Sequence, residues 1–145
     1  MSAADRTEAN KAAFSRFHDI TNSGDAAAVA KVIKETAAPD LRFHAPVPNG
    51  LSGVEALQRV WAMLLRAFPD LHVTTEDLLA DGDKIVARNI VTGTHQGDYM
   101  GLAPTGKTVR YQEIFIIRYD GGRMAEIWGV VDVLAQRQQL GLVTV

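Results

Sequence analysis

The spacing of apolar residues changes once along the chain, at Pro69, and this change limits the possible fold classes. Before Pro69 the apolar residues recur three or four positions apart, which is typical of amphipathic helices. After Pro69 the pattern becomes that of strands separated by short turns. Helices first and an antiparallel sheet afterwards predict an α+β fold and not a parallel α/β fold.

Three helices are expected before Pro69. The first should stop near Gly24, because glycine is favoured just past a helix end. Asp25 can cap the second helix. The segment Ser52-Gly53-Val54-Glu55 is a capping box that starts the third helix, and Pro69 ends it. The expected apolar faces are made of Ala13, Phe14, Phe17 and Ile20, then Val29, Val32 and Ile33, then Val54, Leu57, Trp61, Leu64 and Phe68.

Five strands and a last helix complete the predicted order. A short strand at Leu41 to His44 should be broken by Pro46 and Pro48. The turns Asp81-Gly82-Asp83 and Asp120-Gly121-Gly122 have the chemistry of hairpins. The other expected elements are strands at Leu71 to Ala80, Lys84 to His95, Thr108 to Tyr119 and Arg123 to Val131, and a short helix at Val133 to Leu140. We find no repeat or linker, so residues 1–145 are expected to form one domain.

Composition excludes several classes of function. The net charge is −2 and the 15 basic residues are scattered, which argues against binding of nucleic acid or an anionic membrane. The absence of cysteine excludes disulfides, thiolate metal sites and a cysteine nucleophile. The polar start lacks the apolar core of a secretory signal, and no apolar run approaches the roughly 20 residues that span a bilayer. A soluble, cytoplasmic protein is therefore expected.

A ligand site is expected inside the predicted fold. Three helices against a strongly curved sheet form a cone with an open wide end, and the space between helices and concave face is a typical place for an apolar pocket. An apolar small molecule is the expected ligand. The residues that could line such a cavity are Trp61, Met63, Leu64, Met100, Tyr111, Phe115 and Trp128.

Glu113 is the first candidate for chemistry. On strand alternation it shares a face with Tyr111 and Phe115. If that face is concave, the loss of solvent would raise the pKa of the carboxyl group and favour general acid/base work near neutral pH. The alternative is an ion pair on the outer face with an arginine of the neighbouring strand, such as Arg88.

Two other carboxylates have simpler explanations beside a functional one. Asp132 follows the last strand and could reach a pocket mouth, but it could equally cap the last helix, which is the favoured interpretation. Glu126 should share a face with Trp128, where an exposed cross-strand contact with Arg118 or Arg110 would explain it.

Histidines and known binding motifs add little. His44 and His95 each end a strand and could shuttle protons or make structural hydrogen bonds, whereas His18 and His72 are expected at the surface. None has metal-ligand spacing, so no metal site is predicted. The sequence has no GxSxG, P-loop or GxGxxG motif, which argues against a tightly bound nucleotide or flavin.

Four segments follow one another along the second half of the chain: FPDLHVTTEDLLADGDKIVARN from Phe68, GTH-x-G from Gly93, GLAPTGK from Gly101 and DGGRMAEIW from Asp120. In order and spacing they together resemble the SnoaL-like polyketide cyclase family. The resemblance implies the cone-shaped α+β roll that is shared with nuclear transport factor, ketosteroid isomerase and limonene epoxide hydrolase. It also implies a homodimer.

The resemblance also shows where this chain departs from the family's chemistry. Cyclases of the family close a ring by intramolecular aldol condensation, in which an aspartate removes the proton next to a carbonyl, a histidine lies nearby and no cofactor is used. In this chain the histidine position is Phe115 and the aspartate position is Gly129. Neither side chain can exchange a proton, so the resemblance implies an apolar pocket that keeps Phe115 and Gly129 and uses another acid or base.

Three functional hypotheses follow. The leading one is a cofactor-independent cyclase or isomerase acting on an apolar, carbonyl-bearing molecule such as a polyketide. Glu113 or Asp132 would be the base, and His44 or His95 would donate a hydrogen bond to the developing enolate. The second is a polyketide hydroxylase or epoxide hydrolase of the same fold. The third is a small-molecule-binding protein without catalysis.

Overall fold

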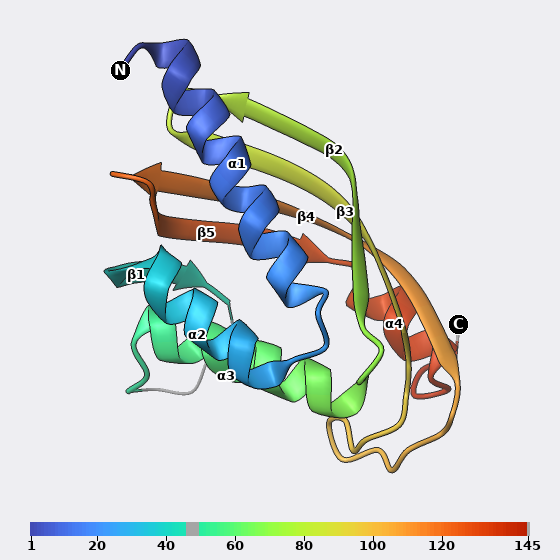
Figure 1. The fold of residues 1–145 in the computed structure, drawn as a ribbon. Helices are drawn as coiled ribbons and strands as arrows, with labels where there is room; N and C mark the ends of the chain where they lie inside the picture. The colour runs from blue at the N-terminus through green and yellow to red at the C-terminus, as the bar shows by residue number, and fades with distance from the viewer. Residues whose placement is uncertain (46–49, 145) are drawn as a thin grey trace.

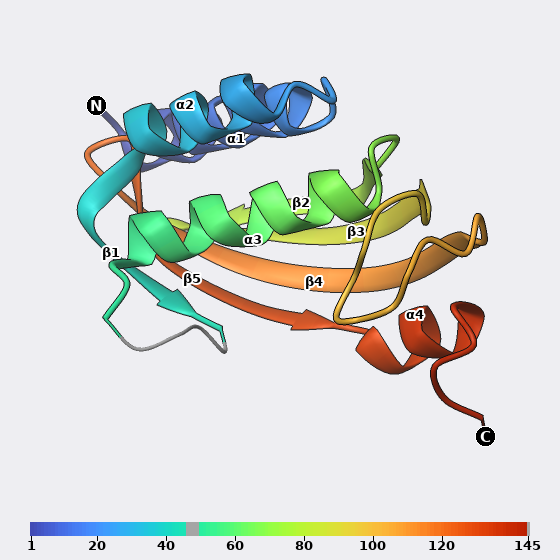
Figure 2. The same cartoon turned by 90° about the horizontal axis from the view of Figure 1, so that it is seen from below.

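The computed structural model describes residues 1–45 and 50–144 and shows helices packed on one curved sheet (Figures 1 and 2). The sheet has the strand order β1-β5-β4-β3-β2, in which β1 runs parallel to β5 and the other neighbours are antiparallel. This confirms the α+β prediction. In chain order the elements are α1 (Ala3–Thr21), α2 (Ala26–Thr36), β1 (Ala37–His44), α3 (Gly53–Ala67), β2 (His72–Asp81), β3 (Lys84–Thr94), β4 (Thr108–Asp120), β5 (Arg123–Val131) and α4 (Val133–Gln139).

The helices α2 and α3 begin at the caps that the sequence predicts. The Asp25 side chain accepts a hydrogen bond from the amide of Ala28 at 3.1 Å and starts α2. In front of α3, Ser52 Oγ accepts from the Glu55 amide at 3.1 Å while Glu55 Oε2 accepts from the Ser52 amide at 3.3 Å. These bonds occupy first-turn donors that the helices leave without partners.

The strands agree with the predicted ranges to within a residue, except at β1. This strand starts at Ala37 and not at Leu41, because the chain passes from α2 directly into extended backbone. It lies at the sheet edge, where Pro39 is tolerated because an edge strand has unpaired amide positions. The break predicted from Pro46 and Pro48 lies outside the described residues.

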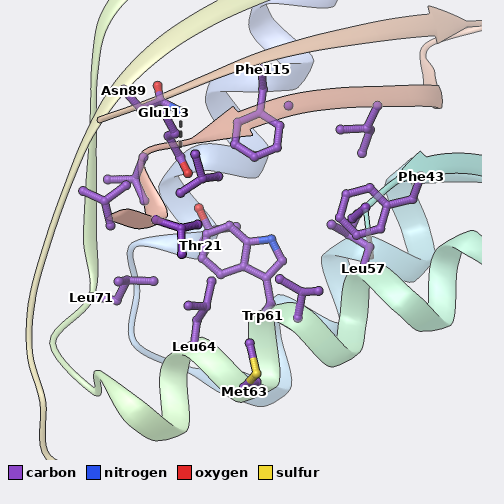
Figure 3. Close-up of a pocket in the computed structure, with 18 of the residues that line it drawn as sticks. Thr21, Phe43, Leu57, Trp61, Met63, Leu64, Leu71, Asn89, Glu113 and Phe115 are labelled. Atoms are coloured by element: carbon purple, nitrogen blue, oxygen red, sulfur yellow. Dashed lines mark hydrogen bonds between the residues drawn. The ribbon is translucent and has the colours of Figure 1, made fainter. Parts of the chain in front are cut away.

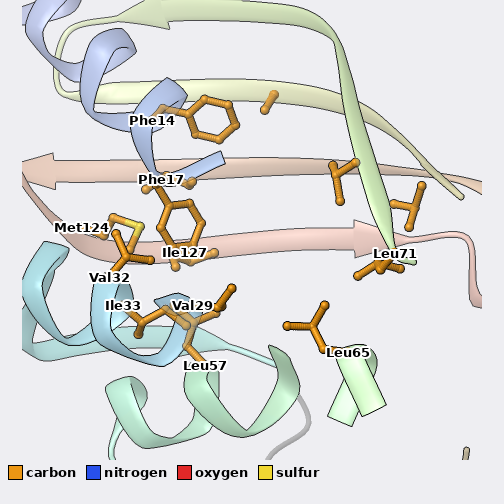
Figure 4. Close-up of a cluster of buried hydrophobic side chains, with 14 of the residues drawn as sticks. Phe14, Phe17, Val29, Val32, Ile33, Leu57, Leu65, Leu71, Met124 and Ile127 are labelled. Atoms are coloured by element: carbon orange, nitrogen blue, oxygen red, sulfur yellow. The ribbon is translucent and has the colours of Figure 1, made fainter. Parts of the chain in front are cut away.

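The core lies between α1–α3 and the concave face of the sheet (Figure 4). Phe14 and Phe17 of α1 are buried there together with Val29 and Ile33 of α2. Figure 2 shows these helices on one side of the sheet, with α4 beyond the end of β5. None of the helices in the described part of the chain is long and apolar enough to cross a membrane.

Candidate active site

A cavity of about 490 Å³ opens between the helices and the concave face of the sheet (Figure 3). Its walls are mostly apolar and come from α1, α3, α4 and the strands β1 to β5. Most of the residues predicted to line a ligand site line this cavity, namely Trp61, Met63, Leu64, Met100, Tyr111, Phe115 and Gly129.

Trp128 was also expected to line the cavity, and its position requires a correction. It lies on the opposite face of β5 from the cavity-lining residues Ile127 and Gly129. Its ring stacks on His44 at 5.4 Å between centroids, and Lys84 Nζ lies 5.7 Å from the ring centre. Because alternate residues of a strand face opposite ways, a tryptophan beside Gly129 cannot share its cavity.

Glu113 lines the cavity from the concave face of β4, as the alternation of its neighbours suggested. Its side chain is partly buried, and Asn89 Nδ2 donates a hydrogen bond to Glu113 Oε1 at 3.1 Å. Arg88, the alternative partner, lies beside Asp77 with Nε 2.6 Å from Oδ2. Burial raises the pKa of the Glu113 carboxyl above its ordinary value, and the bond from Asn89 offsets part of this rise.

Asn89 is a site residue that sequence reasoning missed. It is 4% exposed, lines the cavity and faces Glu113 directly across the β3–β4 pairing. Thr75 Oγ1 donates to Asn89 Oδ1 at 2.9 Å, so the Asn89 amide group is held with its nitrogen toward Glu113. A polar residue inside the apolar strand Lys84–Thr94 was the available signal, but only the strand register identifies its partner.

A second polar region lies where α4 meets the cavity. Tyr99, Tyr111, Gln136 and Arg137 all line it, and Tyr99 Oη donates to Gln136 Oε1 at 3.0 Å. Burial raises the pKa of Tyr111 far above its ordinary value, so its hydroxyl is protonated at neutral pH. Gln136 and Arg137 were not candidates from the sequence, because nothing local indicates that α4 folds back onto the cavity. Tyr99 lies between β3 and β4, outside any strand whose alternation would assign its side chain to a face.

His95 is buried outside the cavity lining. Its Nδ1 accepts from the Thr105 amide at 3.2 Å and lies 2.9 Å from Thr105 Oγ1, while its ring packs on Phe68. The structure therefore gives His95 a structural role in holding the loop between β3 and β4. His18 requires the opposite correction, because it is half-buried and lines the cavity, and burial lowers its pKa. His72 is exposed, as expected.

His44 lies at the cavity wall but is tied to the outer face of the sheet through Glu126. His44 Nε2 lies 2.7 Å from Glu126 Oε2, and Arg118 Nη2 lies 3.4 Å from Glu126 Oε1. The predicted contact of Glu126 with Arg118 is present, although Glu126 is buried and not exposed. The bond from His44, with the charges of Arg42 and Arg118, lowers the pKa of Glu126.

Asp132 caps α4 and is not among the cavity-lining residues. Its Oδ1 accepts from the Ala135 amide at 3.0 Å, and the side chain is exposed. Asp132 is therefore the N-cap of α4, as the favoured interpretation of the sequence predicted. Within residues 1–45 and 50–144, we find no group of three or more histidine, aspartate or glutamate side chains arranged to hold a metal ion.

Phe115 and Gly129 are directly opposite each other on β4 and β5. The Phe115 ring lies over Gly129 so closely that a Cβ at position 129 would come within 2.2 Å of Phe115 Cε1. A side chain at 129 is therefore incompatible with the present position of the ring. Phe115 and Gly129 therefore form one steric unit.

Comparison with known proteins agrees with this architecture. Among solved structures, AclR, a putative hydroxylase from Streptomyces galilaeus, is similar at 28% identity and a TM-score of 0.81, over 99% of this chain and 89% of that one. TsrD from Streptomyces laurentii is similar at 26% identity and a TM-score of 0.81, over 94% of this chain and 97% of that one. IdmH, a putative polyketide cyclase from Streptomyces antibioticus, is similar at 28% identity and a TM-score of 0.76, over 91% of this chain and 98% of that one.

The sequence comparisons assign the family. No curated protein sequence matches the chain. The family model described as SnoaL-like polyketide cyclase matches residues 11–140, which is nearly the whole length. Together with the curved sheet and its cavity, this match establishes that the chain belongs to the SnoaL-like polyketide cyclase family.

Proposed function

We propose that this protein is a cofactor-independent enzyme that removes a proton next to a carbonyl of an apolar small molecule, with Glu113 as the base. The reaction class is cyclisation or isomerisation, and a polyketide is the substrate class. The observation that carries the proposal is the Glu113 carboxyl at the wall of an apolar cavity, with a raised pKa and a single defined hydrogen bond from Asn89. A base with these properties suits proton transfer near neutral pH.

Residues of the cavity can supply each step of this reaction. The Glu113 carboxylate takes the proton from carbon, and electrons of the broken C–H bond move to the carbonyl oxygen as an enolate. Tyr111, two residues away on the same face and protonated, supplies a hydrogen bond to that oxygen. In a cyclisation the enolate carbon attacks a second carbonyl and Glu113 returns its proton to the new alkoxide. In an isomerisation the proton returns to another carbon.

Hydrogen–deuterium exchange on a model ketone tests the role of Glu113. We expect the wild-type protein to accelerate exchange next to the carbonyl of 2-tetralone in D₂O, followed by NMR. Replacement of Glu113 by Gln should lower the accelerated rate by about 10²- to 10⁴-fold, the usual contribution of a general base. Asp132→Asn is the matched control, because asparagine also caps helices well, and its rate should equal that of the wild type.

The outcomes separate the alternatives. Full exchange activity in Glu113→Gln would show that the assignment of the base is wrong. If the wild-type protein binds 2-tetralone without accelerating exchange, the non-catalytic binding protein becomes the better hypothesis. That hypothesis is supported by Phe115 and Gly129, which leave no proton-exchanging side chain at the usual cyclase positions.

A hydroxylase is the second candidate function. It is favoured by the similarity to AclR, which is named a putative hydroxylase and matches 99% of this chain. The mass of the product distinguishes the two reactions. Cyclisation or isomerisation leaves the mass unchanged or lowers it by one water, whereas hydroxylation adds an oxygen atom and epoxide hydrolysis adds a water.

A further inference from the structure

One cationic side chain reaches the cavity from α4, and the proposed reaction does not use it. Arg137 is the only lysine or arginine among the described residues that line the cavity, and Glu113 is the only aspartate or glutamate. An arginine in a mostly apolar wall is costly unless an acceptor pairs with it. The contacts of Arg137 therefore bear on which ligand the cavity takes.

The guanidinium of Arg137 has little to bind within the described part of the chain. Its Nη2 lies 3.5 Å from Met100 Sδ, and thioether sulfur is a weak acceptor. Its Nε is buried without a hydrogen-bond partner. Among the ion pairs of residues 1–45 and 50–144, none includes Arg137. A guanidinium has five N–H donors, and most of those of Arg137 have no acceptor among the described protein residues.

The turn of α4 that carries Arg137 is anchored by its neighbours. Gln136 is 2% exposed and accepts the hydrogen bond from Tyr99, which anchors this turn of α4 to the loop after β3. The Arg137 charge is close enough to Tyr99 to lower its pKa, against the larger opposing effect of burial. Among the ion pairs of the described residues, none joins Glu113 to Arg137. The cavity thus has one carboxyl group and one guanidinium group that are not paired with each other.

We propose that Arg137 binds a carboxylate group of the ligand, and that the substrate is therefore an apolar, ring-bearing acid with a free carboxylate. The planar guanidinium matches a carboxylate with two parallel hydrogen bonds, and the surrounding low polarity strengthens the pairing. The apolar part of the ligand then lies along Trp61 and Phe115 toward Glu113. This inference rests on the proposed function only in taking the same cavity as the site.

A pair of probes that differ only in charge tests the proposal. Binding of 2-naphthoate and of its methyl ester would be measured by isothermal titration calorimetry on the full chain. We expect the wild type to bind the acid at least about tenfold more tightly than the ester, as a charge-assisted hydrogen bond implies. In Arg137→Gln the affinity for the acid should fall about tenfold or more, while the affinity for the ester changes less than about twofold.

Two further variants complete the design. Arg137→Lys keeps the charge without the planar fork, and it should recover part of the affinity for the acid. Arg110→Gln removes an exposed arginine of β4 whose backbone contacts α4 through Gln139, and it should leave both affinities unchanged. Thermal unfolding of each variant checks that it is folded.

The proposal is overturned if the acid and the ester lose affinity equally in Arg137→Gln, if neither loses affinity, or if the wild type binds neither probe. Its failure is distinct from failure of the proposed function. A selective loss of the acid in Arg137→Gln, with normal exchange activity in Glu113→Gln, would support the carboxylate site and reject the base. If Glu113→Gln loses exchange activity but Arg137→Gln shows no selective loss of affinity for the acid, the base is supported and the carboxylate site is rejected.

Discussion

At position 113 the structure holds a carboxyl group where its charged form is disfavoured. Asn89 donates the hydrogen bond that an ionised or neutral carboxyl can accept, but burial dominates and raises the pKa. A group whose pKa is raised on folding stabilises the fold most at a pH below its unfolded pKa, and this contribution is lost as pH rises through the folded value. Folding at neutral pH is therefore opposed by the ionised Glu113.

This gives a prediction on stability at the scale of one residue. Glu113→Gln removes the charge and keeps an acceptor for Asn89, so it should increase the free energy of unfolding at pH 7. The gain is on the order of 1 kcal/mol for each tenfold change in acid dissociation constant. At pH 4 and below, where the wild-type carboxyl is protonated, the difference should vanish. Urea unfolding between pH 4 and 8 measures it, with the exposed Glu76→Gln as the control. A destabilised Glu113→Gln at pH 7 would contradict the assigned pKa direction.

At the scale of elements, the β4–β5 pairing couples Phe115 to Gly129. The Phe115 ring occupies the volume that a side chain at position 129 would need. The effect of a substitution at position 129 on stability therefore depends on the residue at position 115, and the reverse also holds. This explains in steric terms why a glycine lies in the middle of the cavity wall of β5.

Gly129→Ala should therefore destabilise the protein by roughly 1–3 kcal/mol, the usual cost of overpacking. Phe115→Ala alone should also destabilise it, because the ring covers the wall of the cavity. The double variant should lose less unfolding free energy than the two single variants lose together, because the clash between the ring and the new methyl group is gone. Denaturant unfolding of the four proteins in a double-mutant cycle measures the coupling. Additive effects would show that the ring is free to move away from Gly129.

At the scale of the whole molecule, the convex face of the sheet exposes apolar side chains. Ile114 and Val130 are Cα partners on β4 and β5 and are 47% and 77% exposed. Ile116, on the same face, is 36% exposed. Figure 2 shows α1, α2 and α3 on the other side of the sheet. We propose that a second copy of the chain covers this face in a symmetric homodimer, as the family resemblance implies.

Light scattering after size-exclusion chromatography tests the homodimer. The wild-type protein should have twice the 15.8 kDa mass of one chain. Ile114→Lys should give the mass of one chain, because a lysine on each side of a two-fold axis places like charges in an apolar interface. Leu134→Lys, at an exposed apolar position of α4, is the control and should keep the mass of the wild type. A single-chain mass for the wild type would exclude the dimer at the concentration used.

The sequence alone determined the features that depend on residues a few positions apart. Caps at Asp25 and Ser52, the glycine turn at Gly82 and the shared face of Tyr111 and Glu113 were all predictable, because short-range hydrogen bonds and side-chain alternation set them. This was enough for the fold class and for the group of β4 residues that share a face with Glu113, the leading candidate for the base.

Only the tertiary structure decided which residues from distant segments meet. The parallel pairing of β1 with β5, the bond of Asn89 to Glu113 and the arrival of Arg137 at the cavity each depend on long-range packing. Trp128 was misplaced for the same reason, because alternation groups the residues of a strand into two faces without saying which face is concave. That choice is made by the curvature of the whole sheet and by the helices packed against it.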